Sequence, residues 1–157
     1  MTKNEIIAKT DVLIVGAGPT GFLLANLLGS MGVETIVIER NEGTVQEPRA
    51  VSIDDESMRA LQAAGLSSKV EKIVTRGYGS IYKGPSGQVF SEVKPSSKEF
   101  GFDKRNAFQQ PMLESLLLNG LKRFESVKFF FKTTLVSFKD NSETVISLTK
   151  RWQKISL

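Results

Sequence analysis

The chain has 157 residues, 40% of them hydrophobic and 24% charged, which suits one compact domain with a hydrophobic core. It has no cysteine and no histidine, which excludes disulfides, thiolate or imidazole metal sites and a histidine general base. The net charge of +4 comes from scattered basic residues, so we expect no nucleic-acid partner. No stretch reaches the roughly 20 apolar residues of a membrane span, and residues 1–10 lack a signal-peptide pattern, so we expect a cytoplasmic protein.

A short apolar run at 11–15 predicts a strand that is buried on both faces. A turn with the spacing G-x-G-x-x-G follows it, and this turn consists of Gly16, Ala17, Gly18, Pro19, Thr20 and Gly21. Gly16 lets the chain leave the strand sharply, Gly18 lets a diphosphate approach the backbone, and Gly21 lets the next helix lie close to the strand. Pro19 suits the first helical turn, whose N–H groups favour a bound phosphate.

A Leu-rich helix over 22–30 and a second buried strand over 34–39 complete this motif. Glu39 ends the second strand, where its carboxylate can accept hydrogen bonds from ribose hydroxyls and repel a 2′-phosphate. Arg40 follows it directly. The order of strand, glycine turn, helix, strand and acid predicts an α/β, Rossmann-like βαβ domain for FAD or NAD rather than NADP. A strand–turn–helix unit with no ligand is the alternative.

An acidic cluster opens the next predicted helix, at 54–64, and Gly65 ends it. Ser52 and Asp55 have the spacing of a capping box. The cluster could instead hold a metal ion, but neighbouring acids on a helix point in different directions, so we expect no metal site.

The middle of the chain predicts a β-hairpin of two strands, 77–82 and 88–93, joined by the turn 84–87. A strong helix follows over 112–124, with Leu113, Leu117 and Leu121 on one stripe.

Three further strands are predicted near the end of the chain, at 127–131, 134–139 and 144–149. The phenylalanine run 129–131 is expected in the core. Residues 150–157 show no pattern, so we place one domain at 1–149 and an unpatterned tail at 150–157. No catalytic constellation accompanies the nucleotide motif.

Several short motifs, in addition to the three glycines, are typical of one protein family. They are Ala25, Leu28 and Gly32 in the helix, Glu39-Arg40, Pro48-Arg49-Ala50 before Ile53 to Glu56, and Arg105 to Phe108 before Gln110-Pro111 and Leu113-Glu114. Together they resemble the N-terminal part of the FAD-dependent aromatic hydroxylases, the single-component flavoprotein monooxygenases. The resemblance covers about 11–148. It implies an FAD-binding domain with a hairpin insertion at about 77–93 that contributes toward a substrate domain.

The resemblance also implies roles for single residues. The glycine turn would hold the FAD diphosphate, and Glu39 would hold the ribose. Arg49 would lie near the flavin and diphosphate, Gln110 would contact the ribityl and diphosphate portion, and the Val136 backbone would meet the adenine. NADH or NADPH would reduce the flavin, and O2 with a small phenolic substrate would complete the reaction. No residue is predicted to act as a catalytic acid or base.

Members of that family are much longer, and they carry later Asp-Gly and Gly-Asp segments that this sequence lacks. We therefore expect a truncated fragment that binds FAD weakly or not at all and does not hydroxylate. Two other functions stay open: another FAD-dependent oxidoreductase with the same glycine motif, and a non-catalytic module that kept a nucleotide fold. The sequence predicts neither the aromatic substrate nor the oligomeric state.

Overall fold

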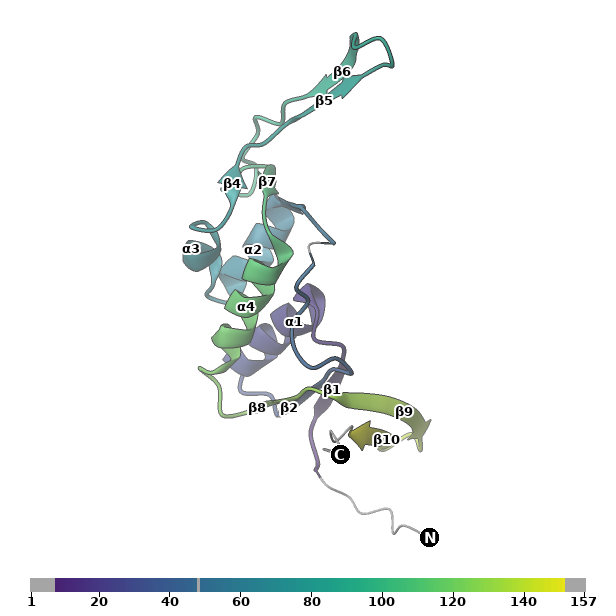
Figure 1. Cartoon of the computed structure of the whole chain (residues 1–157). Coiled ribbons are helices and arrows are strands. Elements are labelled where there is room, and N and C mark those ends of the chain that lie inside the picture. Colours follow the sequence, from purple (N-terminus) through teal and green to yellow (C-terminus); the bar gives the residue numbers. More distant parts are fainter. Residues whose placement is uncertain (1–7, 48, 152–157) are drawn as a thin grey trace. The chain divides into compact units, whose positions relative to one another are not determined.

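The computed structural model describes residues 8–47 and 49–151. The chain divides into two compact units (Figure 1). Unit 1 is formed by Met1–Thr44 with Leu121–Leu157, and unit 2 is formed by Val45–Gly120. Among the described residues, the structure contains no helix that could span a membrane.

Unit 1 is built on a parallel sheet and one helix: β1 (Val12–Val15), α1 (Pro19–Ser30), β2 (Thr35–Ile38) and β8 (Val127–Phe130). The strand order is β1-β2-β8, and β2 pairs in parallel with both neighbours. Figure 1 shows α1 beside β1 and β2. The predicted strand–turn–helix–strand motif is confirmed, although the helix begins at Pro19 rather than at Phe22.

Helix α1 is held by both apolar and polar contacts. Phe22 and Ala25 are fully buried, and an added Cβ at Gly29 would collide with the ring of Phe124. The buried Asn26 donates from Nδ2 to the Phe22 carbonyl at 2.8 Å and accepts from Arg123 Nη2 at 3.0 Å. A segment almost a hundred residues further along the chain is thereby fixed against this helix.

Strand β8 differs from its prediction in burial. Phe129 and Phe130 are 37% and 36% exposed, so the expectation that the phenylalanine run lies in the core is wrong for these two. Because β8 forms an edge of the described three-stranded sheet, its side chains have no further strand beside them. The rings of Phe129 and Phe131 instead meet edge to face, with 5.8 Å between their centroids.

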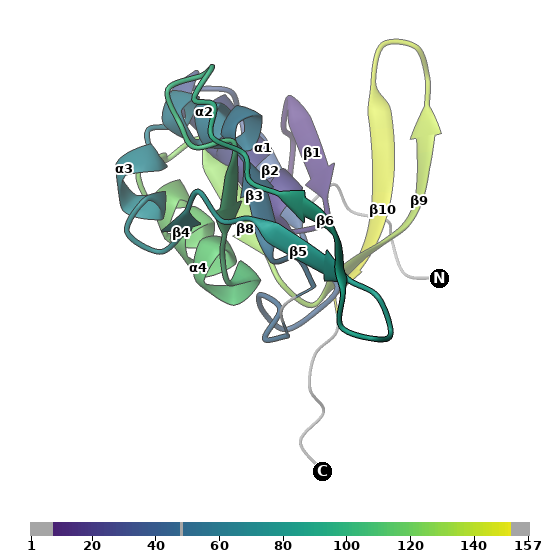
Figure 2. The ribbon, with the colours of Figure 1, turned by 90° about the horizontal axis from the view of Figure 1, so that it is seen from above.

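A long hairpin follows, made of β9 (Thr133–Asp140) and β10 (Val145–Arg151), as Figure 2 shows. In the turn between these strands, Ser142 N donates to Asp140 Oδ1 at 2.8 Å. Strand β10 includes Lys150 and Arg151, which the sequence placed in an unpatterned tail, whereas 152–157 lie outside the described residues. The hairpin exposes several apolar side chains, namely those of Val136, Phe138, Val145, Ile146 and Leu148.

Unit 2 combines short strands with helices. Its elements are β3 (Ser52–Asp54), α2 (Asp55–Ala63), α3 (Ser67–Val70), β4 (Thr75–Arg76), β5 (Ser80–Lys83), β6 (Val89–Val93), β7 (Arg105–Ala107) and α4 (Gln110–Leu121), the last of which ends in unit 1. Strands β3, β7 and β4 form one antiparallel sheet, and β5 and β6 form the predicted hairpin (Figure 2). The buried Leu113, Leu117 and Leu121 confirm the predicted stripe of α4.

The start of α2 corrects the predicted capping box. Ser52 lies in β3, and the N-cap is Asp54, whose Oδ1 accepts from Ser57 N at 2.8 Å. Hydrogen bonding from the Ser57 side chain, and then from its backbone N–H, lowers the pKa of Asp54 from its usual 3.8. The strand thus runs up to the cap itself, so the helix begins later than the sequence suggested.

We predict that Asp54→Ala lowers the free energy of unfolding by about 1 kcal/mol near neutral pH, as is usual for loss of an N-cap. Because the folded pKa lies below the unfolded value of 3.8, the stabilisation is present above pH 3.8 and is lost as the pH falls through the folded pKa. Urea unfolding at neutral and acidic pH measures this. Asp54→Asn, which keeps a capping oxygen, is the matched control and should stay near the wild type at neutral pH. An equal loss in both variants would contradict the cap.

Candidate functional site

The glycine turn connects β1 directly to α1. Gly16 has a φ of +107°, a conformation that side-chain-bearing residues rarely adopt, and its N–H donates to the Ile38 carbonyl at 2.8 Å. Gly18 is the N-cap of α1, and Pro19 occupies the first helical position. Thr20 follows and is exposed. The turn therefore directs the first N–H groups of α1 outward from the end of the sheet, where they favour an anion.

Gly18 and Gly21 differ in what surrounds them. A Cβ at Gly21 would run into the carbonyl oxygen of Gly16 and would lie 3.4 Å from Ile14 Cγ2. A Cβ at Gly18 would meet nothing within 4 Å. Gly21 thus permits the close approach of helix to strand, while Gly18 leaves open space in front of the backbone. This is the division of work that the spacing predicts.

Glu39 lies beside this turn, one residue after β2. Its Oε2 accepts from Ala17 N at 3.0 Å, and its Oε1 accepts from Asn41 N at 2.8 Å. The structure therefore brings the predicted acid and the glycine turn together. Each carboxylate oxygen keeps a second lone pair, so Glu39 can still accept from hydroxyl groups of a ligand.

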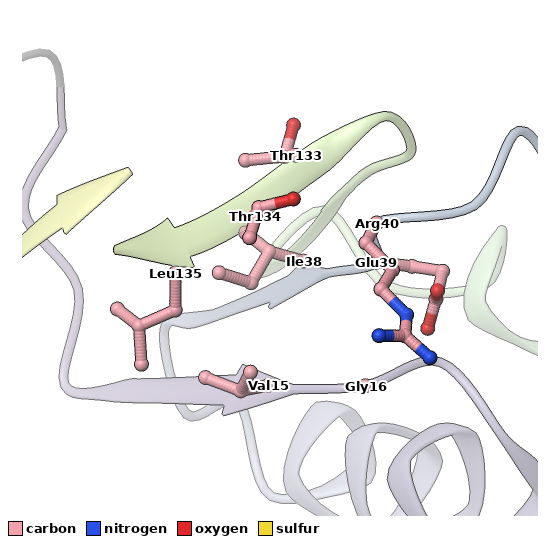
Figure 3. Close-up of a pocket in the computed structure, with 8 residues that line it drawn as sticks. All are labelled: Val15, Gly16, Ile38, Glu39, Arg40, Thr133, Thr134 and Leu135. Atoms are coloured by element: carbon pink, nitrogen blue, oxygen red, sulfur yellow. The ribbon is translucent and has the colours of Figure 1, made fainter. Parts of the chain in front are cut away.

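A cavity of about 210 Å³ opens next to Glu39, at the ends of β1 and β2 and the start of β9 (Figure 3). It is lined by Val15, Gly16, Ile38, Glu39, Arg40, Thr133, Thr134 and Leu135. In Figure 3 the side chain of Arg40 extends toward the turn at Gly16. Apolar walls with an acid and a base among the lining residues suit a planar ring carrying a polar sugar.

The contribution of β9 to this cavity was only partly expected. The strand is tied to the segment after β2, because Thr133 N donates to the Glu39 carbonyl at 2.9 Å and Lys132 N donates to the Asn41 carbonyl at 2.9 Å. The sequence singled out the backbone of Val136 in this strand. The side chain of Val136 is 57% exposed, and its neighbour Leu135 lines the cavity. No local sequence pattern marks Thr133 or Thr134, since their position depends on pairing across the fold.

Arg49 and Gln110 both belong to unit 2, and the structure brings them together. The Arg49 side chain is exposed, whereas Gln110 is only 6% exposed. Gln110 Oε1 accepts from Arg49 N at 3.1 Å and from Ala50 N at 2.9 Å. This contact joins residues about sixty positions apart, so the sequence could not reveal it.

The described residues were also searched for groups that could bind a metal ion. Among residues 8–47 and 49–151, no group of three or more carboxylate, imidazole or thiol side chains could hold a metal ion. What unit 1 offers is a backbone cradle for an anion, an acid for hydroxyl groups and an apolar cavity. These features match the adenosine-diphosphate half of a dinucleotide.

Comparison with known proteins also indicates a dinucleotide-binding domain. Residues 9–152 match the family described as FAD binding domain. Over 140 residues the chain is 43% identical to the 3-(3-hydroxy-phenyl)propionate/3-hydroxycinnamic acid hydroxylase of Comamonas testosteroni, covering 89% of this chain and 24% of that protein. The chain therefore spans about a quarter of the length of the curated relatives that it matches.

Solved structures resemble the fold. The flavin-dependent monooxygenase PieE, in complex with FAD and substrate, has a TM-score of 0.80 at 22% identity, covering 92% of this chain and 27% of that one. The p-nitrophenol 4-monooxygenase PnpA of Pseudomonas putida DLL-E4 has a TM-score of 0.75 at 21% identity, covering 90% and 39%. The predicted α/β fold class is confirmed.

Gly18→Ala and Gly21→Ala form a matched pair with opposite expected effects. The added methyl at Gly21 collides with backbone, so we predict a loss of about 1–3 kcal/mol in the free energy of unfolding. The methyl at Gly18 enters open space, so stability should change by less than about 1 kcal/mol while affinity for FAD falls. Denaturant unfolding and an FAD titration separate the two effects. Equal stability losses would contradict the close approach at Gly21.

Proposed function

This chain belongs to the FAD-binding domain family, and we propose that it forms the adenosine-diphosphate side of the FAD site in a monooxygenase that hydroxylates a phenolic aromatic acid. The observation that carries the proposal is the position of Glu39, whose carboxylate is bonded to the glycine turn at Ala17 N. A cytoplasmic location, expected from the sequence, belongs to the same proposal.

The site residues have separate tasks in this proposal. The open space at Gly18 and the N-terminus of α1 would receive the diphosphate. Glu39 would accept from the ribose hydroxyls, with Arg40 at the rim of the same cavity. The apolar walls at Val15, Ile38 and Leu135 would enclose the adenine ring, beside the backbone of Val136.

By the same resemblance, Arg49 and Gln110 would serve the flavin end of the cofactor. The guanidinium of the exposed Arg49 can pair with a diphosphate or with the polar edge of a flavin. FAD, when bound, supplies the redox chemistry that couples oxidation of NADH or NADPH to hydroxylation by O2. The protein's part is to orient the cofactor and to exclude water around it.

The substrate class comes from the relatives. A protein 43% identical to this chain is named a hydroxylase of 3-(3-hydroxyphenyl)propionate and 3-hydroxycinnamic acid, so we propose a small phenolic acid as substrate. Because the chain spans about a quarter of that relative, we also propose that these 157 residues alone hold FAD weakly and do not hydroxylate.

A titration of the purified chain with FAD, followed by flavin fluorescence, tests the binding proposal. Glu39→Ala removes the acceptor for the ribose and for Ala17 N, so we predict at least an approximately tenfold rise in the Kd, equivalent to about 1.4 kcal/mol. Glu34→Ala removes an exposed carboxylate just before β2 and is the matched control, with a change of less than about twofold. Unchanged affinity in the Glu39 variant would contradict the assignment.

A turnover assay tests the second half of the proposal. We expect the 157-residue chain, given FAD, NADH or NADPH, O2 and 3-(3-hydroxyphenyl)propionate, to release no hydroxylated product detectable by chromatography. Product formed in proportion to enzyme would show that this quarter of the relatives' length suffices for catalysis.

A further inference from the structure

Two buried polar side chains of α4 lie one helical turn apart and contact each other. Glu114 is 1% exposed and Gln110 is 6% exposed. Gln110 Nε2 donates to Glu114 Oε1 at 2.8 Å, and Glu114 Oε2 accepts from Val45 N at 3.0 Å. Together with the bonds from Arg49 N and Ala50 N to Gln110 Oε1, this pair accepts hydrogen bonds from three backbone N–H groups of one loop.

The loop in question comprises 45–47 and 49–50, and we refer to it as the Arg49 loop. Its two ends are held by different side chains. Val45 N donates to Glu114, whereas the N–H groups of Arg49 and Ala50 donate to Gln110. The Arg49 side chain itself is exposed. The backbone of the loop is therefore anchored while the side chain of Arg49 is exposed.

The donor and acceptor count shows how fully the pair is used. Both lone pairs of Gln110 Oε1 are occupied by the loop, and one hydrogen of Nε2 is occupied by Glu114. Only one amide hydrogen of Gln110 is left for any other partner. A buried carboxylate is costly unless its oxygens accept hydrogen bonds, and both oxygens of Glu114 do so here.

We infer that Gln110 and Glu114 are a positioning pair, which sets the conformation of the Arg49 loop and so raises flavin affinity through Arg49. Glu114 holds the Gln110 amide in the orientation in which its oxygen faces the loop. Both residues act through Arg49. The effect on flavin affinity rests on the proposed function, whereas the effect on the loop does not.

The chemistry of the pair provides a rescue experiment. Glu114→Gln replaces one accepting oxygen with an NH2 group. In either orientation this NH2 group faces another donor, the Val45 N–H or the Gln110 NH2, so one hydrogen bond is lost. Gln110→Glu sets a second carboxylate against that of Glu114. The double variant Q110E/E114Q restores every bond, because the carboxylate then lies at position 110 and accepts from the loop and from the new amide, whose oxygen accepts from Val45 N.

Two readouts on the full 157-residue chain decide the matter. The rate of amide hydrogen exchange at Val45, Arg49 and Ala50, measured without FAD, reports how firmly the backbone of the Arg49 loop is held. The Kd for FAD reports whether the conformation of the Arg49 loop affects cofactor binding. We expect each single variant to speed exchange at these amides and to raise the Kd about tenfold or more, and the double variant to return both to within about threefold of the wild type. Gln109→Glu, the same change at the exposed preceding residue, is the control and should alter neither.

Three results would overturn the inference. The first is a double variant no better than the single variants in exchange, which would mean that the pair does not hold the loop. The second is restored exchange without restored affinity, which would assign Gln110 a direct contact with the cofactor. The third is unchanged affinity in the single variants despite faster exchange. If the wild type binds no FAD, the proposed function fails, and exchange in the four proteins still decides whether the pair positions the loop.

Discussion

The candidate site depends on one carboxylate, that of Glu39, which is bonded at once to the glycine turn and to the segment after β2. Its two oxygens accept from Ala17 N and Asn41 N, two backbone groups that the sheet alone does not join. The same segment is bonded to the start of β9 through Thr133 N and Lys132 N. The glycine turn, Glu39 and the start of β9 are therefore joined by hydrogen bonds within the protein itself, and such preorganisation lowers the ordering cost of binding.

Two other buried polar contacts use the same principle. Asn26 joins α1 to Arg123, and the Gln110–Glu114 pair joins α4 to the Arg49 loop. Each contact connects segments that are distant in the sequence and irregular at one end, where apolar burial alone would allow several arrangements. A buried polar group is stable only in an arrangement that satisfies its hydrogen bonds. Such a contact therefore favours a single conformation of the segments that it joins.

The features that could be predicted from the sequence are those carried by local spacing. The glycine turn, Glu39 at the end of β2, the leucine stripe of α4 and the β5–β6 hairpin all follow from residue patterns within a single segment. The resemblance to flavoprotein aromatic hydroxylases, stated from motifs within 16–56 and 105–114, is confirmed by the family match and by the relatives. The predicted roles of the individual site residues remain predictions.

The features that were missed depend on pairing between distant segments. Strands β3, β4 and β7 have two or three residues each, too few to show a period of two. The capping box was assigned to Ser52 because its spacing to Asp55 is right, but β3 extends through Ser52 and leaves Asp54 as the cap. The burial of Phe129 and Phe130 was overestimated because hydrophobicity does not tell a central strand from an edge strand.

The connection from β2 to β8 has a consequence for how such proteins diversify. Parallel neighbours need only a crossover of about a dozen residues, yet this one runs from Glu39 to Ser126 and contains the whole of Val45–Gly120. The pairing of β2 with β8 therefore needs only a small part of that length. Unit 2 is thus inserted between two paired strands, so a change in its length need not alter the register of the parallel sheet.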